Sequence, residues 1–184
     1  LIRKEYYETS GYQKNDNLFT IIIIGGSQGA KIFDELLNKS FANISKQVSI
    51  KIIHQTSKKN INFLKNFYSQ NNIESSVFSF DHNLNEVLKQ GDLCITRAGA
   101  SSLAELSILN IPFVAIPLPS SKDNHQYENA KYYKEQDCCW IIDQKNFDDQ
   151  KFEKFLLDLI NKSKDYTTKK NNLQKLNYQN TWNN

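Results

Sequence analysis

The chain has 184 residues, which is about one domain, since domains usually run to roughly 100 to 200 residues. Hydrophobic residues make up 39% and charged residues 23% of it, a composition that excludes collagen-like, mucin-like and wholly disordered chains. The formal net charge of +3 is too small, and its charges are too dispersed, to indicate a nucleic acid as the main partner.

The three cysteines, Cys94, Cys138 and Cys139, show no Cys-x-x-Cys spacing, and no histidine lies at ligand spacing from them. This pattern argues against a disulfide framework or a zinc site and favours a reducing cytoplasm. The apolar runs are far shorter than the roughly 20 residues of a membrane-spanning helix, and no signal-peptide pattern opens the chain. We therefore expect a cytoplasmic protein without a transmembrane segment. Because the chain has no methionine and begins with Leu1, we interpret it as a piece or processed product of a longer protein.

Apolar runs bounded by turn residues alternate with stretches of helical spacing along most of the chain. The patterns predict strands at 18–24, 51–54, 77–80, 93–96, 112–116 and 139–142. They predict helices at 29–44, 61–68, 84–88, 101–109, 124–135 and 152–160. This alternation indicates a Rossmann-like α/β fold, with a parallel sheet, helices on both faces and ligands at the carboxyl ends of the strands.

The composition also suggests how the chain is divided. Residues 1–17 are polar and read as a linker, and residues 18–163 contain the predicted Rossmann-like domain. Residues 164–184 are rich in Asn and Lys and form a polar tail, for which a helix is one interpretation.

The first candidate site is the segment 25–30, Gly-Gly-Ser-Gln-Gly-Ala, which directly follows a predicted buried strand. Glycines allow a tight turn, and the amides at a helix start suit an anion such as phosphate. Gly26, Ser27 and Gln28 are its candidate contacts. The motif is neither Gly-x-Gly-x-x-Gly nor a Walker loop with its lysine, so a plain strand-to-helix turn is the alternative.

A second strand end, glycine turn and helix start lies at 96–105. The amides near Ala100 and the hydroxyls of Ser101 and Ser102 would form another anion cradle at the same edge of the sheet, and two cradles suit a diphosphate. Glu105, one helical turn after Ser101, either accepts hydrogen bonds from both hydroxyls of a ribose or closes a capping box with Ser102. Arg97 either contacts the anion or ties the turn to a neighbouring carbonyl.

A loop with two prolines leads into the fifth predicted helix. His125, Gln126 and Asn129 lie near its start and offer donors and acceptors of the kind that read sugar hydroxyls. The alternative is that Asp123 or Asn124 caps the helix, while the side chains of its first residues are solvated. His125 has no nucleophile partner that would indicate a catalytic triad.

Six pieces of the sequence, taken jointly, resemble one known family. They are Ile2-Arg3, Gly-Gly-Ser-Gln-Gly-Ala at 25–30, His54-Gln55-Thr56, Arg97-Ala98-Gly99-Ala100 with Glu105, Pro117-Leu118-Pro119, and His125-Gln126 with Asn129-Ala130. In this order and spacing they resemble the C-terminal half of the MurG family, bacterial glycosyltransferases of family 28 that add GlcNAc from UDP-GlcNAc to a lipid-linked muramyl-pentapeptide. Two positions depart from the family pattern: Leu1 stands in place of proline, and Ser57 in place of glycine.

The resemblance implies a GT-B fold of two Rossmann-like domains, of which this chain would be the C-terminal, UDP-sugar-binding one. Carried over position by position, it implies that Arg3 contacts the uracil ring. The backbone near Asp81, with Leu84 packing close by, would line the base pocket.

For the rest of the donor, the resemblance implies that Ser27 and the amides of Ala100 to Leu103 hold the diphosphate. Glu105 would hold the ribose hydroxyls, and Gln126 and Asn129 would hold the GlcNAc hydroxyls. Ala104 lies on the same helix start and completes the predicted contact segment.

The implied function is donor binding in an inverting transfer of GlcNAc to lipid-linked MurNAc-pentapeptide, the conversion of lipid I to lipid II in peptidoglycan synthesis. We expect no cofactor and no metal, because the carboxylates do not cluster. The family's N-terminal half, with its acceptor loop and general base, has no counterpart here, so we expect the chain alone to be inactive. The full-length enzyme would sit peripherally on the cytoplasmic face of the inner membrane.

Two other functions compete with this one. The chain could be a non-catalytic nucleotide-sugar-binding subunit of a split lipid-linked GlcNAc transferase, which would need a partner chain. An oxidoreductase or a nucleotide-binding regulator built on a Rossmann domain is disfavoured, because the sequence lacks the dinucleotide fingerprint.

Overall fold

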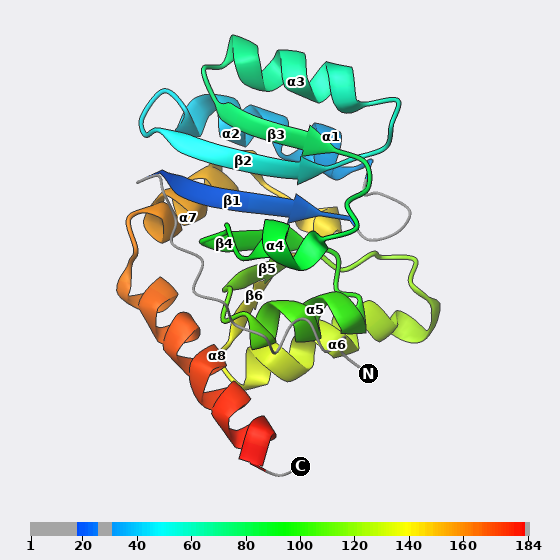
Figure 1. The fold of residues 1–184 in the computed structure, drawn as a ribbon, viewed down its shortest axis with the longest axis vertical. Coiled ribbons are helices and arrows are strands. Elements are labelled where there is room, and N and C mark those ends of the chain that lie inside the picture. Colours follow the sequence, from blue (N-terminus) through cyan, green and yellow to red (C-terminus); the bar gives the residue numbers. More distant parts are fainter. Residues whose placement is uncertain (1–17, 26–30, 183–184) are drawn as a thin grey trace.

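The structure is a computed structural model that describes residues 18–25 and 31–182, with side chains as far as residue 177. The strands are β1 (Phe19–Ile24), β2 (Ile50–Gln55), β3 (Glu74–Phe78), β4 (Leu93–Thr96), β5 (Phe113–Ala115) and β6 (Cys139–Ile141). The α-helices are α1 (Phe33–Leu36), α2 (Asn38–Ile44), α3 (Ile61–Gln70), α4 (Leu84–Leu88), α5 (Ala100–Ile108), α6 (His125–Glu135), α7 (Asp149–Ile160) and α8 (Lys164–Trp182). Short 3₁₀ helices, η2 (Lys122–Asn124) and η3 (Gln144–Asn146), precede α6 and α7 (Figure 1).

The described strands form one parallel sheet in the order β3-β2-β1-β4-β5-β6. Helices cover both faces of this sheet, as Figure 1 shows. The prediction of a Rossmann-like α/β fold is therefore confirmed. The order also puts β1 and β4 side by side, with Ile24 opposite Thr96 at their carboxyl ends.

Alternate residues of β1 supply two separate apolar cores. Ile21 and Ile23 face the core formed with α1, α2, α3 and α7, whereas Ile22 and Ile24 face the core formed with α4, α5, α6 and α8. A strand buried on both faces needs an unbroken apolar run, since successive side chains point to opposite sides. The run Phe-Thr-Ile-Ile-Ile-Ile meets this need, and all six residues of β1 are buried.

Two predicted boundaries are wrong. The single helix predicted at 29–44 is divided into α1 and α2. At the break, Asn38 Nδ2 donates to Asp34 O at 2.5 Å, so the side chain of Asn38 competes for the carbonyl that its own backbone amide would bond in a continuous helix. The third strand begins at Glu74 instead of residue 77. It is an edge strand with polar, partly exposed residues, so the apolar pattern marked only its end.

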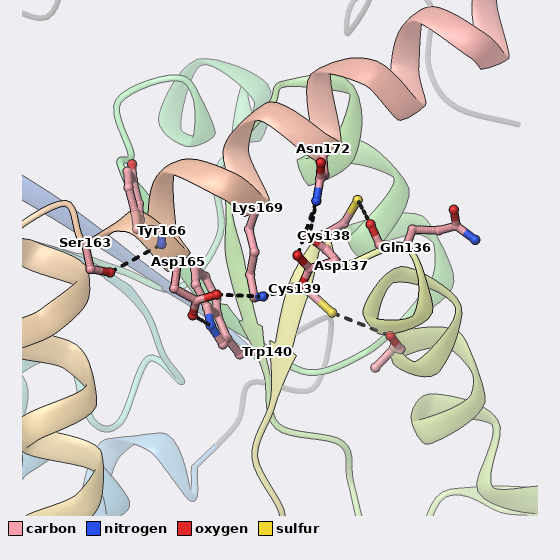
Figure 2. A network of polar contacts seen from close by, with 11 residues as sticks. Gln136, Asp137, Cys138, Cys139, Trp140, Ser163, Asp165, Tyr166, Lys169 and Asn172 are labelled. Atoms are coloured by element: carbon pink, nitrogen blue, oxygen red, sulfur yellow. Dashed lines mark hydrogen bonds and ion pairs between the residues drawn. The ribbon is translucent and has the colours of Figure 1, made fainter.

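The polar tail forms α8, which is anchored by polar contacts around the buried Lys169 side chain. Lys169 Nζ lies 2.6 Å from Asp137 Oδ1 and 3.1 Å from Asp165 Oδ1, and its ammonium lies 5.1 Å from the centre of the Trp140 ring (Figure 2). Trp140 Nε1 donates to Asp165 Oδ2 at 2.6 Å. Tyr166 OH donates to Asp92 O at 2.9 Å. Because Asp92 and Asp137 precede β4 and β6, α8 crosses the amino ends of the strands. None of the helices in this described region is both long and apolar enough to cross a membrane.

Candidate functional site

The carboxyl ends of β1 and β4 form the point where the strand order reverses. From β1 the chain proceeds to β2 and β3 on one side, and it returns to β4, β5 and β6 on the other. Ligands in open parallel sheets bind outside such a point. The backbone amide of Arg97 also donates to Ile24 O at 3.4 Å, which joins the two strand ends. Both strands end at the same edge of the sheet, as predicted, and they are also neighbours.

The β4–α5 junction presents the first amides of a helix at this edge. Gly99 is the N-cap of α5, with extended φ and ψ of −68° and 135°. The first intrahelical bond runs from the Leu103 amide to Gly99 O at 3.0 Å, so the amides of residues 100–102 precede it. Ala100 and Ser101 are exposed, and Ser102 is partly exposed. This turn is suited to an anion.

The capping box considered for Ser102 and Glu105 does not form. The helix begins at Ala100, so Ser102 is its third residue and does not occupy the N-cap. Glu105 lies one turn after Ser101 on α5 and is partly exposed. Its predicted bonds with ribose hydroxyls remain a prediction.

Arg97 is buried and makes contacts within the protein. Its Nη1 donates to Ile116 O at 2.9 Å and its Nη2 donates to Gln144 Oε1 at 2.8 Å. The guanidinium carbon lies 4.9 Å from the centre of the Phe33 ring. Burial lowers the pKa of Arg97 from its usual value. Of the two roles considered for Arg97, the structure shows the tie between the turn and a neighbouring carbonyl.

The side chains of Gln126 and Asn129 link α6 to the two loops beside it. Gln126 Oε1 accepts a hydrogen bond from the Leu118 amide at 2.9 Å. Asn129 Nδ2 donates to Ala98 O at 3.0 Å, which holds α6 against the β4–α5 junction. These two hydrogen bonds involve the Gln126 oxygen and the Asn129 nitrogen. They do not involve the Gln126 nitrogen or the Asn129 oxygen. The two side chains predicted to read a sugar thus stand beside the predicted phosphate cradle.

The start of α6 differs from a standard capped helix. Asp123 and Asn124 have positive φ angles of 49° and 54°, a conformation that these residue types tolerate better than most. Asn124 is the N-cap but makes no side-chain capping bond. His125 is exposed, and its Nδ1 lies 2.6 Å from Lys122 O. Asn124 thus occupies the N-cap, as one alternative expected, but its side chain makes no capping hydrogen bond.

A hollow of about 400 Å³ lies at the ends of β5 and β6, next to α6. Its lining includes Pro117, Leu118, Tyr127, Ile141 and Asp143. None of the site residues predicted from the sequence lines it.

The predicted base pocket follows β3, and β2 and β1 lie between that strand and β4. Asp81 is exposed, and its Oδ1 accepts a hydrogen bond from the Asn83 amide at 2.8 Å. Leu84 is partly buried and begins α4. Because the sheet is parallel, this loop and the β4–α5 junction share one edge.

Comparison with known proteins identifies the family to which this chain belongs. Residues 20–181 match the model of the glycosyltransferase family 28 C-terminal domain. The chain belongs to this family. The matched range includes α8 except its last residue, and it begins after the segment interpreted as a linker.

Curated relatives of the family 28 domain include two N-acetylglucosamine transferases. They are named UDP-N-acetylglucosamine–N-acetylmuramyl-(pentapeptide) pyrophosphoryl-undecaprenol N-acetylglucosamine transferase. The one from Pelagibacter ubique is 42% identical over 184 residues, covering all of this chain and 52% of the relative. The one from Rickettsia massiliae is 41% identical over 165 residues, covering 88% of this chain and 44% of the relative. The chain thus spans about half the length of these relatives.

Solved structures of glycosyltransferases share this fold. Acinetobacter baumannii MurG superposes with a TM-score of 0.79 at 25% identity, covering 90% of this chain and 50% of that one. The glycosyltransferase VinC, solved with DTDP, has a TM-score of 0.60 at 10% identity, covers 97% of this chain and 40% of that one, and supports the fold alone.

Several predicted contacts of the family 28 domain lie outside the described residues. These are Arg3, Gly26, Ser27 and Gln28. The other predicted contacts lie at the carboxyl edge of the sheet or on the helices that begin there, and their roles toward a donor remain predictions.

One buried polar cluster was missed from the sequence. Asp34, on α1, is only 1% exposed, although carboxylates are rarely buried without partners. It stands between the apolar residues Phe33 and Leu36, and nothing in the helical pattern distinguishes it from a solvated residue. The only hint was the sequence His54-Gln55-Thr56, whose two outer side chains turn out to face Asp34.

Proposed function

We propose that this chain is the donor-binding half of a GlcNAc transferase that transfers GlcNAc from UDP-GlcNAc to a lipid-linked MurNAc-pentapeptide in peptidoglycan synthesis. The observation that carries the proposal is the β4–α5 junction, whose helix-start amides lie at the strand-order reversal of a family 28 domain. The names of the curated relatives support this donor and acceptor.

In this proposal, the chain binds UDP-GlcNAc and stabilises the leaving group. When the acceptor hydroxyl displaces UDP from the anomeric carbon, negative charge grows on the β-phosphate oxygen. Amides near Ala100 to Leu103 can stabilise that charge without moving, which is the advantage of groups that are already oriented. Glu105 would accept from the ribose hydroxyls, and Gln126 and Asn129 would orient the sugar.

The acceptor and the general base belong to the part of the enzyme that this chain does not cover. The relatives carry about as much sequence again in the same chain, which favours this interpretation over a split subunit with a separate partner. The acceptor named for the relatives is linked to undecaprenol, so we place the complete enzyme peripherally at the cytoplasmic face of the membrane. We expect the 184-residue chain to bind UDP without turning over UDP-GlcNAc.

Calorimetric titration with UDP and 2′-deoxy-UDP tests this function at Glu105. The unsubstituted chain is expected to prefer UDP, because a carboxylate that accepts from both ribose hydroxyls loses one bond with the deoxy compound. In Glu105→Gln the preference should largely disappear, since hydrogen bonds to a charged group are worth about 1.5 to 3 kcal/mol, or roughly 10-fold to 100-fold in affinity.

Two results would contradict the proposal. One is the absence of UDP binding by the unsubstituted chain. The other is an equal loss of affinity for UDP and 2′-deoxy-UDP in Glu105→Gln, which would show that Glu105 does not bind the ribose hydroxyls.

A further inference from the structure

The buried carboxylate of Asp34 is surrounded by donors from two other elements. Thr56 Oγ1 donates to Asp34 Oδ2 at 2.7 Å, and Asn60 Nδ2 donates to the same oxygen at 2.5 Å. His54 Nε2 lies 3.3 Å from Asp34 Oδ1. Because His54 and Thr56 stand at the end of β2 and Asn60 stands just before α3, these contacts bind α1 to both elements.

The charges in this cluster follow from its burial and its contacts. Burial alone would raise the pKa of Asp34, but the nearby His54 and the hydrogen bonds from Asn60 and Thr56 outweigh it and lower that pKa, so Asp34 is ionised at neutral pH. Burial lowers the pKa of His54, which is therefore neutral. Tyr68 OH lies 2.7 Å from His54 Nδ1. We assign the His54 proton to Nε2, because a lone pair there would face the carboxylate.

The residue before Asp34 makes a contact on the opposite side. The Phe33 ring lies under the Arg97 guanidinium, at 4.9 Å. Arg97 follows β4 and leads into the β4–α5 junction. Two consecutive residues of α1 therefore hold it between the ends of β2 and β4.

A helix of four residues cannot keep its place by its own hydrogen bonds, since the first helical turn costs more than it returns. The position of α1 must therefore come from its side-chain contacts. Asp34 makes the charged contacts of α1 with the end of β2 and with Asn60. Because Phe33 packs against the Arg97 guanidinium, the position of α1 also determines where Arg97 can lie.

We propose that Asp34 is a positioning residue for diphosphate binding, and this inference rests on the function proposed above. By fixing α1 against the end of β2, the carboxylate keeps Phe33 under Arg97 and so holds the β4–α5 junction in the geometry that receives phosphate. Asp34 itself does not contact the ligand.

The test compares UDP with UMP, because a positioning role in diphosphate binding affects their difference, while general loosening affects both. Asp34→Asn keeps the volume of the side chain and removes its charge. We expect this variant to lower the preference for UDP over UMP by about tenfold, since a tenfold change in affinity is about the contribution of one hydrogen bond to a charged group. Thr56→Val should reduce this preference less than Asp34→Asn does. Thr56→Ser keeps the hydroxyl and should leave the preference within twofold of that of the unsubstituted chain.

A distant variant separates positioning from stability. Lys169→Met removes the buried ammonium that Figure 2 shows beside Asp165, at the amino edge of the sheet, and should lower the melting temperature of the chain. It should leave the preference for UDP over UMP unchanged. If Lys169→Met reduces that preference as much as Asp34→Asn does, the positioning role is wrong.

The remaining outcomes are also decisive. If the unsubstituted chain fails to bind UDP, the proposed function and this inference both fall. If it binds UDP and Asp34→Asn keeps the full preference, only this inference falls. Should Asp34→Asn not fold, the pair Thr56→Val and Thr56→Ser decides. The same preference for UDP over UMP in these two variants would overturn the inference.

Discussion

His54 links the free energy of unfolding to pH. Its side chain is buried between Tyr68 and Asp34, and burial lowers its pKa from the ordinary value of 6.5. In the unfolded chain the imidazole takes up a proton near its ordinary pKa, whereas in the folded chain it stays neutral to a lower pH. The unfolded state therefore binds more protons below about pH 6.5, and stability falls as the pH falls.

We predict that the free energy of unfolding, measured by urea titration, decreases between pH 7.5 and pH 5, with a slope of at most about 1.4 kcal/mol per pH unit from this one group. His54→Gln should remove that part of the slope. Asp34 does not contribute in this range: its pKa is lowered in the folded state, so its stabilisation is lost only as the pH falls below about 4. Identical slopes for the two chains would show that His54 is not buried in its neutral form.

Among the elements, the turn between α4 and β4 packs unusually close to the central strand. A Cβ atom at Gly91 would lie 2.5 Å from Ile22 Cδ1 and 2.8 Å from Ile22 Cγ1. Ile22 is fully buried on β1, so its side chain has little room to move away. Only glycine lets this turn approach β1.

The substitution Gly91→Ala should therefore lower the free energy of unfolding by about 1 to 3 kcal/mol, the usual range for overpacking a core. Gly99→Ala is a matched control, because a Cβ there would meet only Ser102 Oγ at 3.9 Å, an ordinary contact. Urea unfolding followed by circular dichroism measures both. Equal losses for the two substitutions would contradict the close approach at Gly91.

The molecule as a whole has two cores that share one sheet. Ile23 belongs to the core with α1, α2, α3 and α7, and its neighbour Ile22 belongs to the core with α4, α5, α6 and α8. Because neighbouring residues of β1 fill opposite cores, neither core can lose its packing while β1 keeps its place.

We therefore predict a single cooperative unfolding transition. Ile23→Ala and Leu106→Ala, one in each core, should each cost about 2 to 5 kcal/mol and shift the whole transition. Circular dichroism and tryptophan fluorescence should give the same midpoint for every variant. A second transition, or a shift seen by only one probe, would show that the two cores unfold separately.

The candidate site was predictable where it depends on short patterns and not where it depends on distant partners. Gly99 followed by Ala100 and Ser101 indicated a helix start, and the structure has one there. For Arg97, the sequence left two roles open, because Ile116, Gln144 and Phe33, the groups that it meets, are far from it in the chain. Asp34 was missed for the same reason, since its partners come from β2 and from the start of α3.

The amino-acid sequence alone determined the alternation of strands and helices, the parallel sheet and the edge at which a ligand is predicted to bind, because apolar runs and turn residues act over a few positions. It also indicated the family through short motifs. Only the tertiary structure decided which buried charges meet, that the polar tail becomes α8, and that α1 and α2 separate at Asn38. These outcomes depend on contacts between residues far apart in the chain, whose energies local patterns do not contain.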